Sequence, residues 1–108
     1  MSCHCPDVAL ELARAVREPW RKLRADHASS LADQLVRAAQ SVVLNVCEGS
    51  RLRRKSAVHS FTIAAGSASE VDGALRSAEG LGLLTFDEIA EALVLCDRLG
   101  GMLYRLTH

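Results

Sequence analysis

Apolar residues recur three and four positions apart in four successive stretches of the chain, which is the spacing of an amphipathic helix. The stretches expected to be helical are residues 6–24, 30–48, 56–79 and 85–106. Connections of about three to seven residues favour antiparallel packing of sequential helices. We therefore predict an all-α fold, an antiparallel up-and-down four-helix bundle.

Proline, capping residues and glycine mark the ends of these helices. Thr85 and Glu88 fit a capping box that opens the fourth helix. Pro19 lies inside the first helix, where its ring removes a donor and clashes with the preceding turn, so this helix should be kinked or broken near Pro19. The other signals are Pro6 in a first turn, Ser29 or Ser30 as a cap, and Gly49, Gly80 and Gly82 as stop residues.

Length and charge limit the classes of protein that fit. Residues 1–108 suffice for one core, so a single domain is expected, with 1–5 as a frayed tail. The 13 basic and 13 acidic residues balance, so no global field attracts nucleic acid or a membrane. No apolar run approaches the roughly 20 residues of a membrane span, and Asp7 and Glu11 interrupt any signal peptide. We expect a cytoplasmic protein with no membrane partner.

The second helix carries an unusual line of polar residues opposite an apolar half. This polar ridge consists of Gln34, Arg37, Ser41, Asn45 and Glu48. One interpretation is a face in contact with water. The other is a subunit contact, where the Asn45 amide and a pair between Arg37 and Glu48 or Glu70 would fix the register of two helices.

The third helix contains Gly66 and Gly73 on nearly the same face. Glycine inside a helix costs about 1 kcal/mol relative to alanine, so two aligned glycines indicate a close backbone approach. Close helix packing is the first interpretation, and a ligand groove is the second.

The only dense run of charge joins these two helices. This basic turn holds Arg51, Arg53, Arg54 and Lys55 around Leu52. Four cations could contact phosphates or an acidic protein, or could simply form a solvated loop without aromatics for base stacking.

Residues for catalysis or metal binding lack the patterns that such chemistry needs. Cys3, His4 and Cys5 have no second half of a metal site, and all four cysteines are expected to be reduced thiols. His59 has no Glu three residues before it for a di-iron site and no oriented third group for a nucleophilic triad. Cys47 would need a histidine beside it to act as a nucleophile. We expect no enzymatic activity, no metal and no cofactor.

Several motifs together resemble a known family. The run from Gln34 to Gly49 agrees with it, as do the basic turn, Phe61 with Ile63-Ala64, Gly66-Ser67 with Glu70, Leu81 to Leu84, and Met102-Leu103 with Leu106. Over about residues 31–106 the chain resembles the bacterial four helix bundle protein family, first noticed as proteins encoded by intervening sequences in 23S ribosomal RNA genes. The resemblance marks as signature positions Gln34, Arg37, Ser41, Asn45, Glu48, Gly66, Ser67 and Glu70, with Arg51 in the adjoining turn.

The resemblance also implies a ring-shaped pentamer. A distant relative, the accessory protein of diversity-generating retroelements, binds nucleic acid and a reverse transcriptase, although it is strongly basic whereas this chain is neutral. Our hypothesis is a non-enzymatic, homo-oligomeric, pentameric binding scaffold that contacts RNA or an RNA-associated protein through Arg51, Arg53, Arg54 and Lys55. The alternative is a structural protein–protein interaction module with no nucleic-acid role.

Overall fold

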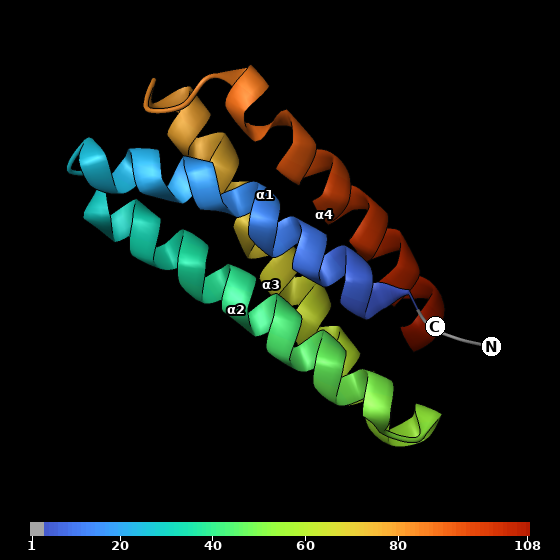
Figure 1. Cartoon of the computed structure of the whole chain (residues 1–108). Coiled ribbons are helices and arrows are strands. Elements are labelled where there is room, and N and C mark those ends of the chain that lie inside the picture. Colours follow the sequence, from blue (N-terminus) through green and yellow to red (C-terminus); the bar gives the residue numbers. More distant parts are fainter. Residues whose placement is uncertain (1–3) are drawn as a thin grey trace.

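Four helices make up nearly all of the protein. The computed structural model describes residues 4–108. The helices are α1 (Cys5–Ala25), α2 (Ser29–Arg51), α3 (Arg54–Gly80) and α4 (Phe86–Thr107), and the described residues contain no strand. Each helix packs beside the next, and α4 closes the bundle against α1 (Figure 1). The predicted all-α four-helix bundle is confirmed, as an elongated body of 43 × 21 × 19 Å.

The core is built from aliphatic residues on the predicted faces. Leu12, Leu35, Leu75 and Leu99 are fully buried, one from each helix. Alanines fill much of the buried face of α3, which allows close packing of its neighbours. Phe86 is the first residue of α4 and is 60% exposed, so it lies outside this core. None of the helices in residues 4–108 is long and apolar enough to cross a membrane.

Two helices end in the same left-handed stop at the same end of the bundle. Gly82 has φ +76° after α3, and the amide of Leu83 donates to the carbonyl of Ala78 at 2.9 Å. The predicted glycine stop is therefore confirmed there. His27 has φ +62° after α1, and the Ala28 amide donates to Leu23 at 2.8 Å in the same pattern.

The predicted ends of α2 are wrong. Ala28 stands at the N-cap position, and no side chain caps this terminus. Gly49 does not stop the helix but lies buried within it. A Cβ at Gly49 would approach Cε1 of Phe61 to 2.6 Å and its Cδ1 to 2.8 Å, so glycine is required here by a neighbouring ring. The turn to α3 shrinks to Leu52 and Arg53.

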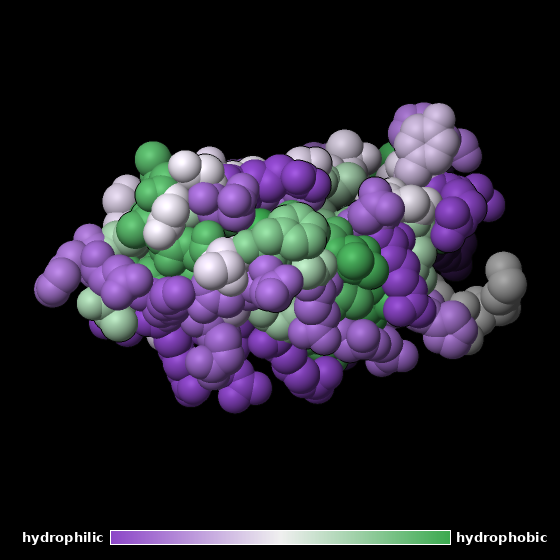
Figure 2. Space-filling model, turned by 90° about the horizontal axis from the view of Figure 1, so that it is seen from above, coloured by the Kyte–Doolittle hydropathy of each residue, from purple (hydrophilic) through white to green (hydrophobic). Residues whose placement is uncertain are grey.

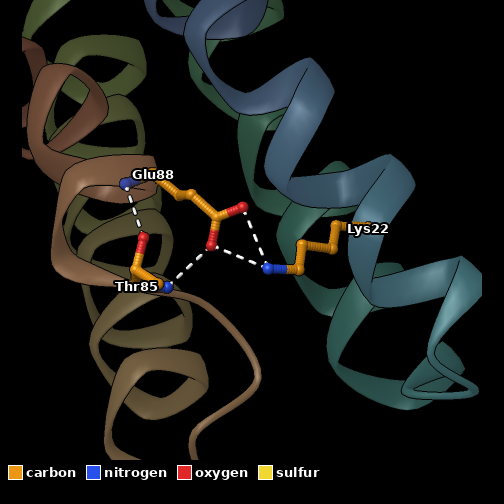
Figure 3. A network of polar contacts seen from close by, with 3 residues as sticks. All are labelled: Lys22, Thr85 and Glu88. Atoms are coloured by element: carbon orange, nitrogen blue, oxygen red, sulfur yellow. Dashed lines mark hydrogen bonds and ion pairs between the residues drawn. The ribbon is translucent and has the colours of Figure 1, made fainter.

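The fourth helix begins with the predicted capping box. The Glu88 amide donates to the Thr85 hydroxyl at 3.2 Å, and the Thr85 amide donates to Glu88 Oε1 at 2.8 Å. Lys22 on α1 donates to both Glu88 oxygens, at 2.9 and 3.0 Å (Figure 3). The carboxylate thus joins a helix cap to a neighbouring helix.

The first helix differs from expectation at its start. It runs as one element through the buried Pro19, so it is not broken into two helices, while the kink stays a prediction. Cys5 begins α1 and is fully buried, so it does not belong to the tail predicted for residues 1–5. Pro6 lies in the first turn of α1, as predicted, a position that suits proline at a helix start. Cys3 lies outside the described residues.

Candidate binding surfaces

The polar ridge of α2 faces α3 of the same chain along much of its length. Ser41 and Asn45 are half-buried at this helix contact, and the hydroxyls of Ser41 and Ser67 share a hydrogen bond of 2.7 Å. The Asn45 amide donates to the Ser41 carbonyl at 2.9 Å and to its hydroxyl at 3.3 Å. The ridge therefore has a use that its sequence did not reveal, since polar residues of α3 satisfy part of it.

A further bond extends this contact toward the α2–α3 turn. The hydroxyl of Ser60, itself buried, donates to Glu48 Oε2 at 3.4 Å. Buried hydroxyls need such partners, because an unpaired polar group costs about 1–3 kcal/mol. Sequence reasoning missed Ser60, although it lies seven residues before the signature Ser67 on the same face of α3.

The opposite part of the ridge is open. Gln34 and Arg37 line a cavity of about 550 Å³ together with Glu70 and Gly73 of α3. Neither Arg37 nor Glu70 makes an ion pair within residues 4–108. The structure thus brings five of the eight signature residues together in one groove, while Asn45, Glu48 and Gly66 lie outside it. The charged rim of the groove forms no ion pair among residues 4–108.

The glycines of α3 do not serve close packing within the chain. An added Cβ at Gly66 or Gly73 would meet no atom within 4 Å. Both glycines are exposed, so the close helix packing predicted for them is wrong inside this chain. Because glycine has no side chain, the surface of α3 is flat at these two positions beside the groove.

The basic turn is exposed as predicted, but it is mostly helical. Arg51 ends α2, while Arg54 and Lys55 begin α3. Arg54 shares a cavity of about 550 Å³ with Arg105 from the end of α4. None of the turn's four cations forms an ion pair with a described carboxylate.

The fold separates charge along the bundle although the chain is neutral. We call the end with the α2–α3 turn the basic end and the opposite one the acidic end, dividing each helix at its middle. The basic half holds Arg14, Arg51, Arg53, Arg54, Lys55, Arg98 and Arg105 against Asp7, Glu11, Glu48 and Asp97. The acidic half holds the remaining charges, with an excess of carboxylates. Local fields at the two ends are therefore of opposite sign.

The Cys96 thiol is part of the bundle core. Cys96 is buried, and burial, with the negative charge of Asp72 as a second cause, raises its pKa to about 12. A thiol with this pKa is an inert core residue at neutral pH. No group of three or more potential metal ligands occurs within the described residues.

Sequence reasoning also missed an apolar groove between α1 and α2. It has a volume of about 510 Å³ and is lined by residues that include Trp20, Val43 and Leu44. Leu44 is 68% exposed, outside the core stripe of its helix. That position on the helical wheel was the available signal, because an apolar residue there has no place in the bundle core.

Fold and surfaces together define a small helical-bundle protein with a polar α2–α3 groove and charge separated between its ends. The chain belongs to the 23S rRNA-intervening sequence protein family, whose model matches residues 4–105. It is similar in fold to a Bacteroides thetaiotaomicron protein with unknown function from the S23 ribosomal protein family. That crystal structure has a TM-score of 0.86 and 17% identity, with 95% of this chain and 97% of that chain covered. No curated protein matches the chain.

Proposed function

We propose that this chain is a homo-oligomeric, pentameric binding scaffold with no chemistry of its own, and that its basic end contacts RNA or an RNA-associated protein. The observation that carries the proposal is the group of four exposed cations at the α2–α3 turn, which form no ion pair with any carboxylate in the described part of the chain. Cations without internal partners are free to bind phosphates. Membership of a family of proteins from ribosomal RNA intervening sequences supports RNA as the client.

The separation of charge explains how a neutral protein could bind a polyanion. Binding depends on the field at the contact, and that field is screened within about 10 Å at 0.1 M salt. Acidic residues at the opposite end of a body 43 Å long therefore weaken it little. In an oligomer the basic ends of several copies would act together.

The experiment replaces Arg51, Arg53, Arg54 and Lys55 with alanine and measures retention of single-stranded RNA at increasing salt. We expect the wild type to bind in a salt-sensitive manner and the variant to lose retention, with the slope of log affinity against log salt reduced by about 3. The particle mass should stay unchanged.

The matched control removes the same charge from the acidic end, by alanine at Arg21, Lys22, Arg24 and Arg76. This variant should keep its RNA binding if the position of the cations matters. Absence of salt-sensitive binding by the wild type, or equal losses in the two variants, would reject the RNA contact.

The groove residues offer a separate test of their role in assembly. Arg37 and Glu70 form no ion pair within residues 4–108, so a neighbouring copy could pair with them. We expect Glu70→Ala and Asn45→Leu to change the particle mass in light scattering more than the helix content in circular dichroism. An unchanged mass for both variants would remove the polar ridge from the subunit contact.

A second candidate function is a structural protein–protein interaction module with no nucleic-acid role. The zero net charge favours it. Affinity purification from the native host with and without nuclease separates the two functions. A protein partner that survives nuclease supports the module, and recovered RNA supports the scaffold.

A further inference from the structure

The groove between α1 and α2 exposes large apolar side chains that do not pack into the bundle core. Leu10 on α1 is 40% exposed and Leu44 on α2 is 68% exposed, with Trp20 and Val43 between the two helices. The charged residues that line the groove are Arg14 and Arg17, and no carboxylate of residues 4–108 lines it. An apolar groove with a cationic rim fits a helix that is apolar and acidic on one face.

The first half of α4 presents such a face. Phe86 is 60% and Val94 66% exposed, and the exposed carboxylates of Asp87 and Glu91 lie on the same side of the helix. No lysine or arginine occurs from residue 77 to residue 97, and the exposed Arg98 follows one turn after Val94. Figure 2 shows the molecule of Figure 1 from above. On this face, hydrophobic residues are exposed between hydrophilic ones.

The two surfaces cannot meet within one chain. α4 packs against α1 and α3 and lies diagonally across the bundle from α2, so its outer face points away from the groove. We propose that the α1–α2 groove of one copy binds the outer face of α4 from a second copy. This inference rests on the homo-oligomer proposed above and assigns its contact.

Such a contact has a defined symmetry. Because the groove and the α4 face are different surfaces, each copy uses both, and the contact is head-to-tail. Repetition of a head-to-tail contact gives a closed ring or an open filament. Arg37 lies seven residues before Leu44, on nearly the same line along α2, so the open end of the polar groove borders the same contact.

The test uses one variant for each surface. Leu44→Glu places a carboxylate in the groove, and Val94→Glu places one on the α4 face; both positions are exposed, so the fold should survive. Each variant alone should fall from the wild-type mass to the 11.7 kDa of one chain in light scattering. Mixed at high concentration, they should form a complex of one chain of each, because one intact groove then meets one intact α4 face and the next contact is blocked.

Trp20 provides a second readout. It is the only tryptophan and lines the groove, so its emission should shift to shorter wavelength in the wild-type assembly and in the mixture, but not in either variant alone. Leu81→Glu is the matched control, since Leu81 is 72% exposed outside both surfaces, and it should keep the wild-type mass.

The outcomes separate this contact from the oligomer itself. A wild-type particle mass of 11.7 kDa would overturn both the homo-oligomer and the groove contact. A larger wild type whose mass survives both variants would overturn the groove contact alone. Variants that are single chains but form no complex when mixed would overturn the head-to-tail pairing.

Discussion

The two ends of the bundle handle their charges and helix termini differently. At the acidic end, α1 and α3 stop in left-handed turns, Thr85 caps α4, and Glu88 is held by Lys22, while the start of α2 has no side-chain cap among the described residues. At the basic end, no side chain caps the start of α1 or α3, and the cations of the basic turn have no ion pair among the described residues. Polar groups that the chain satisfies itself serve stability, whereas those left unsatisfied are available to a partner. This difference directs the search for a client to the basic end.

The largest effect is expected at the basic end, from Gly49→Ala. The new methyl group would overlap the buried Phe61 ring, and overpacking of a core costs about 1–3 kcal/mol. Chemical denaturation would measure the loss in free energy of unfolding. Gly66→Ala is the control and should gain about 0.5–1 kcal/mol, because its methyl group meets nothing within 4 Å. A neutral Gly49→Ala would show that the ring moves aside freely.

The next effect is expected at the acidic end, from Gly82→Ala. A left-handed φ of +76° costs a residue with a Cβ about 1–2 kcal/mol. The reverse change, His27→Gly at φ +62°, should raise the free energy of unfolding by several tenths of a kcal/mol to about 1 kcal/mol. Thermal unfolding of the two variants would measure both changes in the free energy of unfolding. Shifts of equal sign would contradict the shared stop geometry.

Thr85→Ala should destabilise the protein by about 1 kcal/mol, because the Glu88 amide loses the side-chain hydroxyl that caps the helix and keeps only the Thr85 carbonyl. Thr85→Ser keeps a hydroxyl and should retain most of the stability. If the alanine and serine variants unfold at the same denaturant concentration, the cap contributes nothing measurable.

The smallest effect concerns pH. The backbone hydrogen bond from Thr85, followed by the bond from Lys22, lowers the pKa of Glu88. A lowered folded pKa means that this carboxylate stabilises the protein above its ordinary pKa, and that the contribution is lost as the pH falls through the lowered value. Glu88→Gln should therefore reduce the loss in free energy of unfolding as the pH falls into the acid range. An unchanged loss would exclude Glu88 as a contributor.

Local signals were sufficient wherever one segment decides its own structure. The four amphipathic patterns, the capping box at Thr85 and the stop at Gly82 each depend on residues within a few positions of one another. The exposure of Arg51 to Lys55 follows in the same way from a dense run of cations, which cannot be buried without partners.

Signals failed where a distant segment decides the outcome. Gly49 carries the same apparent stop signal as Gly82, yet Phe61 from the next helix makes it a packing residue. The polar ridge could not be assigned from α2 alone, because Ser60 and Ser67 of α3 provide its partners. Gly66 and Gly73 appeared suited to a close contact, but a Cβ added at either would meet no atom of the described residues within 4 Å.

The sequence by itself determined the helices, their order and the family, because periodicity, caps and short connections are local properties. Only the tertiary structure decided which polar residues are satisfied and which are left open, because that depends on what lies opposite. It also sorted a neutral composition into two charged ends and placed an apolar groove beside α2. These surfaces, produced by packing, carry the proposals for assembly and client binding.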